Sequence, residues 1–149
     1  VVVEEVEDPI PERTTISEEE QEVEREARET SADVISLSKT FVERYGSYSN
    51  EANFSNLEDV IPLMSASFAA ETESFIATAV APVAYYGVST QVITVTVEEE
   101  AETVATVTLT TQREEATVSP QNTSVKYQDI QLTFVKEGGV WKVDSATWL

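Results

Sequence analysis

Cysteine and histidine are both absent from this sequence of 149 residues. Without cysteine the chain has no disulfide, no thiolate metal ligand and no cysteine nucleophile. Without histidine it lacks the commonest general base and the commonest zinc ligand, and every Ser-His-Asp triad is excluded. Glycine and proline are scarce as well, with 4 and 5 residues, while 41% of the residues are hydrophobic. This composition is that of one folded domain.

Basic residues are few, with 9 Lys and Arg against 28 Asp and Glu, which gives a net charge of -19. Such a chain repels phosphate backbones and anionic lipid headgroups, so we expect neither nucleic-acid binding nor polybasic membrane docking. No segment is long and apolar enough to cross a bilayer. The sequence opens on Val1-Val2-Val3 rather than on Met. We interpret this triplet as the end of a membrane anchor upstream of Val1, the one membrane attachment that we expect.

The acidic residues are concentrated near the start, since residues 1–30 carry 12 acidic and 3 basic side chains. Residues 1–16 have no periodicity and contain two prolines, which predicts an extended tether. Residues 17–30 begin with Ser17 and Glu20 in capping-box spacing, followed by strong helix formers. Only Val23 and Ala27 are apolar there, so we expect a solvated helical extension. A docking strip for a basic partner is the alternative.

From Ser31 the apolar spacing is helical, and Gly46 stands where a helix would end. Asn53 or Ser55 can cap a short second helix. A third helix is predicted to begin at Pro62 and to close near Ala81 and Pro82. The apolar stripe of the first helix consists of Val34, Ile35, Leu37, Phe41, Val42 and Tyr45.

After Tyr85-Tyr86-Gly87 the period changes to two, which predicts a strand meander. In the third strand Val125 and Tyr127 share one phase, whereas Ile130, Leu132 and Phe134 share the other, which predicts a β-bulge at Gln128-Asp129. Gly138-Gly139 predicts a two-residue hairpin turn before the last strand, residues 140–149. Helices followed by a meander indicate an α+β fold, with helices on one face of a strongly curved antiparallel sheet of four or more strands.

The order of a long helix, a Pro-started helix pair and a bent meander resembles the NTF2-like superfamily of SnoaL-like or cystatin-like α+β cones. The resemblance covers residues 31–149, and its most specific part is the ending Gly138-Gly139-Val140-Trp141-Lys142-Val143-Asp144. The expected arrangement of a membrane anchor, an acidic tether and a cone is similar to that of extracytoplasmic single-pass members of the superfamily. These include VirB8-like secretion components and Mce-associated proteins. The superfamily includes enzymes, carriers and structural domains, so the resemblance implies a fold more than a function.

The resemblance implies that an enzyme of this fold would work in the open mouth of the cone, with an Asp base and an oxyanion-binding Tyr. The corresponding candidates are Asp33, Tyr45, Tyr85, Tyr86, Tyr127, Asp129 and Asp144. Tyr127 and Asp129 are the pair that would point inward together from the bulged strand, and Tyr85 and Tyr86 either pack in the core or line a cavity mouth or a partner surface. The alternative is a half-buried aromatic ring beside a polar bulge residue, so no residue is assigned as catalytic.

The acidic residues do not suggest a metal site, because the consecutive Glu98, Glu99 and Glu100 alternate between the two faces of a strand. Glu114-Glu115 could hold at most a surface cation, and no glycine-rich phosphate or nucleophile motif occurs. We therefore predict no cofactor and no bound metal.

The outer face of the predicted sheet is uncharged and rich in threonine, which would allow a homodimer through this face or contact with another protein. An ordinary solvated face is the alternative. Its residues are Thr94, Thr96, Thr106, Thr108, Thr110, Gln131 and Thr133. We predict a non-catalytic, tethered interaction domain outside the cytoplasm. The alternatives are a small-molecule binder or isomerase/dehydratase-type enzyme that uses the cone cavity, and a cytoplasmic accessory subunit.

Overall fold

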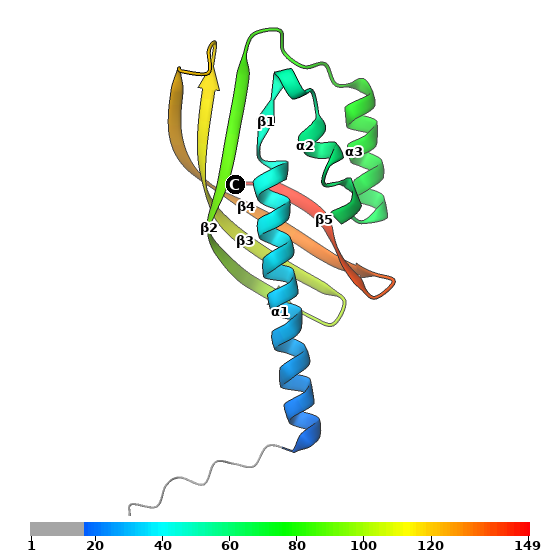
Figure 1. Ribbon diagram of the computed structural model, residues 1–149. Coiled ribbons are helices and arrows are strands. Elements are labelled where there is room, and N and C mark those ends of the chain that lie inside the picture. Colours follow the sequence, from blue (N-terminus) through cyan, green and yellow to red (C-terminus); the bar gives the residue numbers. More distant parts are fainter. Residues whose placement is uncertain (1–16) are drawn as a thin grey trace, which may run out of the picture.

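The structure is a computed structural model that describes residues 17–149, so the predicted tether over residues 1–16 lies outside the described residues. Helices come first and strands follow, which confirms the predicted α+β class (Figure 1). The helical part comprises α1 (Glu18–Tyr45), α2 (Ser55–Glu58) and α3 (Ala66–Thr78), with the 3₁₀ turns η1 (Asn50–Ala52) and η2 (Ile61–Leu63). The strands are β1 (Tyr48–Ser49), β2 (Tyr86–Glu100), β3 (Val104–Thr117), β4 (Thr123–Glu137) and β5 (Val140–Trp148).

The strands form one open antiparallel sheet in the order β1-β2-β3-β4-β5, which curves around α1 (Figure 1). The register shifts twice along β2, between Val92 and Thr94 and between Val97 and Glu99, and once between β4 and β5, at Thr133/Phe134. Such irregularities bend strands and increase their twist, which explains the curvature. The predicted turn at Gly138-Gly139 is confirmed, with φ of 59° and 78°, as a two-residue turn of mirror-image type requires.

The predicted bulge at Gln128-Asp129 is wrong. The pairing of β3 with β4 runs without a shift from Val104↔Val135 to Ala116↔Thr123. Val125 and Tyr127 lie on the outer face in the same phase as Asp129, and they are 53% and 67% exposed. Because Val125 and Tyr127 are apolar although they face solvent, the apolar alternation in the sequence changes phase where the strand itself does not.

Helix α1 is continuous from the acidic segment into the core, so the predicted boundary after residue 30 lies within it. The Ser17 Oγ atom accepts a hydrogen bond from the Glu20 N–H at 3.2 Å, which confirms the predicted N-cap, and Gly46 ends the helix as expected. Figure 1 shows the N-terminal half of α1 projecting past the sheet. Val23 on this half is 64% exposed, whereas Val34 and Phe41 further along are fully buried.

The second and third helices begin elsewhere than the sequence suggested. Phe54 precedes α2 without a side-chain cap, and Pro62 lies in η2. Helix α3 begins only after Ser65, whose Oγ accepts a hydrogen bond from the Phe68 N–H at 3.2 Å. The reason is that residues 64–65 lie along β5, where the Ser65 N–H donates to the Val143 carbonyl at 2.8 Å. This pairing with β5 gives the backbone N–H group of Ser65 a hydrogen-bond partner that a longer helix would otherwise have to supply.

The core lies between α1 and the concave face of the sheet. Phe41 is fully buried and stacks on Tyr45 with ring centroids 5.0 Å apart. The Phe68 ring also packs on Phe41, with a centroid distance of 6.2 Å. Trp141 is buried and Trp148 is partly buried against this core. The other fully buried core residues include Val107, Leu109, Ile130, Leu132 and Val143.

Deletion of residues 1–30 is expected to leave the melting temperature within about 4 °C of its value in the full chain, the shift that ~1 kcal/mol produces in a domain of this size. Residues 18–26 are all exposed, so their removal uncovers little apolar surface. Calorimetry of the two proteins measures the difference. A drop of 10 °C or more would mean that the acidic segment packs on the body and that the domain boundary lies before residue 30.

Candidate functional site

The concave face of the sheet beside the C-terminal end of α1 is where a ligand cavity would lie, and the side chain of Arg113 occupies it. Its Nε donates to Thr90 Oγ1 at 3.2 Å, Nη1 to Gln128 Oε1 at 3.1 Å and Nη2 to the Gly46 carbonyl at 3.3 Å. The guanidinium lies 4.0 Å from the centre of the Trp148 ring, a cation–π distance. Burial lowers the pKa of Arg113 from its ordinary value.

These contacts join the C-cap of α1 and the four strands β2 to β5 in one cluster. Thr90 is buried and its Oγ1 also donates to the Gly46 carbonyl at 2.6 Å, so this carbonyl accepts from two side chains. On the neighbouring strand, the fully buried Thr111 donates from Oγ1 to the Gln128 backbone carbonyl at 2.7 Å. The concave face at this point is therefore filled by hydrogen-bonded side chains.

Tyr86 and Glu115 lie next to this cluster on the same face. Burial raises the pKa of Tyr86, and its hydrogen bond to the Glu115 carboxylate raises that pKa further. The carboxylate also lies 3.8 Å from Lys126 Nζ. Since Glu115 already accepts from a phenol and faces an ammonium group, it resembles a structural ion-pair site more than a general base free to take a substrate proton.

The Tyr48 ring stacks on Phe54 and lies 6.0 Å from the Tyr86 ring, centroid to centroid. Its hydroxyl is buried and has no hydrogen-bond partner among the described residues. Tyr48 therefore contributes packing at the end of the sheet, and its hydroxyl is the one unpaired phenol that the described part of the chain buries.

The predicted pair Tyr127 and Asp129 does not point into the cone. Both side chains lie on the outer face of β4, where Tyr127 pairs with Gln112 and Asp129 with Thr110 across the strands. The expectation of an inward pair depended on the bulge that is absent. Neither residue can meet a ligand on the concave face.

Tyr85 and Tyr86, also predicted together, are separated by the strand. Tyr86 forms a hydrogen bond with Glu115, whereas Tyr85 lies against Gly87 in a shallow surface crevice with Ser89 and Glu114. Of the remaining candidates, Asp33 is exposed, Tyr45 packs in the core, and the Asp144 carboxylate accepts from Ser65 Oγ at 2.7 Å. Of the seven predicted acidic and phenolic candidates, only Tyr85 lines the crevice beside Gly87 and Glu114.

Arg113, Gln128 and Thr90 were not predicted as site residues from the sequence, and Gln128 was named only as part of the predicted bulge. A signal was present for Arg113, because it continues the inward period-two phase of Ala105, Val107, Leu109 and Thr111. An arginine in the inward phase of a strand is costly to bury unless it is hydrogen-bonded. That phase would have predicted a polar cluster inside the cone.

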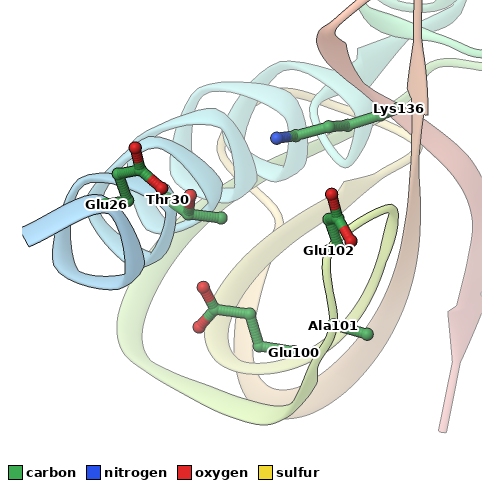
Figure 2. Close-up of a pocket in the computed structure, with 6 residues that line it drawn as sticks. All are labelled: Glu26, Thr30, Glu100, Ala101, Glu102 and Lys136. Carbon is green, nitrogen blue, oxygen red and sulfur yellow. The ribbon is translucent and has the colours of Figure 1, made fainter. Parts of the chain in front are cut away.

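A second candidate is an open crevice of about 490 Å³ where α1 passes the β2–β3 turn (Figure 2). Its lining residues are Glu26, Thr30, Glu100, Ala101, Glu102 and Lys136. Glu100 accepts a hydrogen bond from Ser31 Oγ at 2.5 Å, and Lys136 Nζ lies 5.0 Å from the Trp141 ring centre. Within residues 17–149 no three acidic side chains converge closely enough to hold a metal ion. No helix in the same range combines the length and the apolar character that a membrane span needs.

Comparison with known proteins gives a fold but no close relative. No protein-family model matches the sequence, and no curated protein matches it. The solved structures that match include CagV, a VirB8 homolog of the T4SS from Helicobacter pylori strain 26695. It has a TM-score of 0.58 and 12% identity, over 78% of this chain and 96% of that one.

Two further structures match. One is an Ntf2-like protein involved in plasmid conjugation, with a TM-score of 0.55 and 15% identity, over 81% of this chain and 48% of that one. The other is a scytalone dehydratase-like protein from Novosphingobium aromaticivorans, with a TM-score of 0.47 and 16% identity, over 80% of this chain and 86% of that one. The chain has the NTF2-like α+β cone fold, as its sequence ending implied.

Proposed function

We propose that this chain is a non-catalytic assembly domain of a secretion or conjugation type of membrane complex. The observation that carries the proposal is the filled concave face, where Arg113 binds Thr90, Gln128 and Gly46 and covers Trp148. The fold shared with a VirB8 homolog and with a plasmid-conjugation protein supports an assembly role. With the cone filled, partner recognition falls to the outer surfaces.

The outer face of the sheet is the surface that best suits self-association. Thr96, Thr108 and Gln131 form one cross-strand row, and Thr106 pairs with Thr133 in the next. Thr94, Thr96 and Thr106 each belong to a different cross-strand row of this face. These three rows contain two charged residues, Asp129 and Glu99. Because each copy carries a net charge of -19, two copies repel each other least where charged side chains are fewest. A homodimer through this face is therefore part of the proposal.

Thr108→Glu is expected to weaken this dimer at least tenfold. Thr108 lies mid-sheet, so two-fold pairing of the faces would bury the new carboxylate near its symmetry mate. Sedimentation velocity over a range of concentrations measures the dissociation constant. Thr103→Glu, in the exposed β2–β3 turn, adds the same charge away from the face and should change it less than twofold. A chain that is monomeric at about 100 µM, which corresponds to a dimerisation free energy weaker than about −5.5 kcal/mol, would contradict the dimer. Two variants with equal effects would contradict it as well.

We also propose that the domain is the extracytoplasmic part of a membrane-anchored protein. The fold shared with the VirB8 homolog supports this, as does the resemblance to tethered members of the superfamily. The genomic sequence upstream of Val1 tests it. About 20 consecutive apolar residues directly upstream would support a single-pass anchor, whereas a polar upstream sequence would contradict it.

A further inference from the structure

A shallow apolar groove of about 250 Å³ is lined by residues of α1, α2 and α3. These three helices lie on the same side of the sheet (Figure 1). The lining residues of the groove are Tyr45, Leu57, Phe68, Glu71, Thr72 and Phe75. The Tyr45 and Phe68 rings lie 6.5 Å apart and both pack on the fully buried Phe41. The groove therefore has a firm aromatic base that belongs to the core.

The outer wall of the groove is uncovered. Phe75 is 53% exposed and forms an edge-to-face contact with Phe54, at a centroid distance of 5.5 Å. Of the 13 residues of α3, only Thr72 is buried. After the helix, Val80 and Val83 are almost fully exposed, at 89% and 101%. A helix that leaves this much apolar surface open beside an aromatic groove is typical of a protein-binding site.

The charge around the groove is negative. Glu71 lines it, and Glu58, directly after Leu57, is exposed. The basic residue at this end of α1, Arg44, donates from Nε to Asp59 Oδ2 at 2.7 Å, so its charge is already matched. An apolar groove with an acidic border selects an apolar segment with basic flanks.

We propose that this groove binds the apolar face of a basic amphipathic helix from another protein. The inference rests on the proposed assembly function and names the chemistry of its partner. A second copy of the chain is a poor occupant, because it carries a net charge of -19 and its exposed helical segment, residues 18–26, has six Glu against one Arg. Figure 1 shows the helices on one side of the sheet only, so helix binding here leaves the outer face free for the dimer.

The test uses the full chain and a fluorescein-labelled synthetic helix of about four turns, with leucine at i, i+3, i+4 and i+7 and lysine elsewhere. Fluorescence anisotropy measures its dissociation constant. Phe75→Ala should weaken binding at least tenfold, because that ring forms the open wall. Glu71→Lys should weaken it about three- to fivefold, the range of an exposed ion pair.

Two matched variants control for folding and for the overall field of the protein. Glu73→Lys makes the same charge change on α3 outside the groove, and Val140→Ala removes an exposed apolar side chain in the β4–β5 hairpin. Each should change the dissociation constant less than twofold. Circular dichroism of all four variants should show unchanged helix content.

Three results would overturn the inference. In the first, all variants bind the helix equally, which would mean attraction by net charge alone. In the second, a peptide of the same composition without an apolar face, or one with glutamate in place of lysine, binds as tightly. In the third, Phe75→Ala weakens self-association in sedimentation, which would make a second copy the occupant. If Thr108→Glu fails to affect the dimer while the helix result holds, the sheet-face dimer alone is wrong.

Discussion

Phe41→Ala is expected to lower the free energy of unfolding by about 3–5 kcal/mol, the cost of removing a large aromatic ring from a packed core. The ring is fully buried and contacts both Tyr45 and Phe68, so these rings would border the cavity that its removal leaves. Urea unfolding followed by circular dichroism measures the loss. For a domain at the lower end of the ordinary stability range of about 5–15 kcal/mol, this change brings the variant close to unfolding.

Phe75→Ala is the matched control for that experiment, because it removes the same ring from a side chain that is 53% exposed. Its expected cost is about 1 kcal/mol, mostly from the edge contact with Phe54. Equal losses in the two variants would mean that α3 packs more tightly on the body than the structure has it. The open groove would then not exist in solution.

Arg113→Ala is expected to cost about 2–3 kcal/mol. The change removes hydrogen bonds from a charged donor to Thr90, Gln128 and Gly46, and it uncovers one face of Trp148. Hydrogen bonds to charged groups contribute about 1.5–3 kcal/mol each when they are buried, and this side chain is only partly buried. The same urea titration measures the effect.

Lys126→Ala is the control, because Lys126 pairs with Arg113 across β3 and β4 but is 53% exposed. Its single contact at 3.8 Å, with Glu115, should be worth less than about 1 kcal/mol. If Arg113→Ala costs no more than Lys126→Ala, the guanidinium does not stabilise the packing of the concave face. The concave face would then be open to a ligand, which would favour the binder or enzyme alternative.

Much of the fold follows from local sequence patterns. The helical stripe from Val34 to Tyr45 predicted where α1 packs, and Gly46 and Gly138-Gly139 predicted its end and the last hairpin turn. These signals are local, because caps and two-residue turns depend on only a few neighbouring residues. The division at residue 30 is a different kind of prediction and awaits the deletion experiment.

The features that were missed depend on contacts between distant residues. The third helix begins after Ser65 rather than at Pro62, because the chain first pairs with Val143 on β5. The bulges on β2 and beside Asp144 were also missed, although the apolar alternation changes phase at both, from Val92 to Val95 and from Val143 to Trp148. Arg113 is recognisable as part of a site only when Gly46 and Gln128 are brought to it by the fold.

Native mass spectrometry of the full-length protein, purified under mild conditions from the cells that produce it, tests the central claim most directly. With Arg113 and Trp148 filling the cone, we expect no retained small molecule, and we expect masses of the dimer or of a complex with another protein. A small molecule bound at one copy per chain would contradict the account. It would show that the concave face opens to a ligand and that the domain is a carrier or an enzyme.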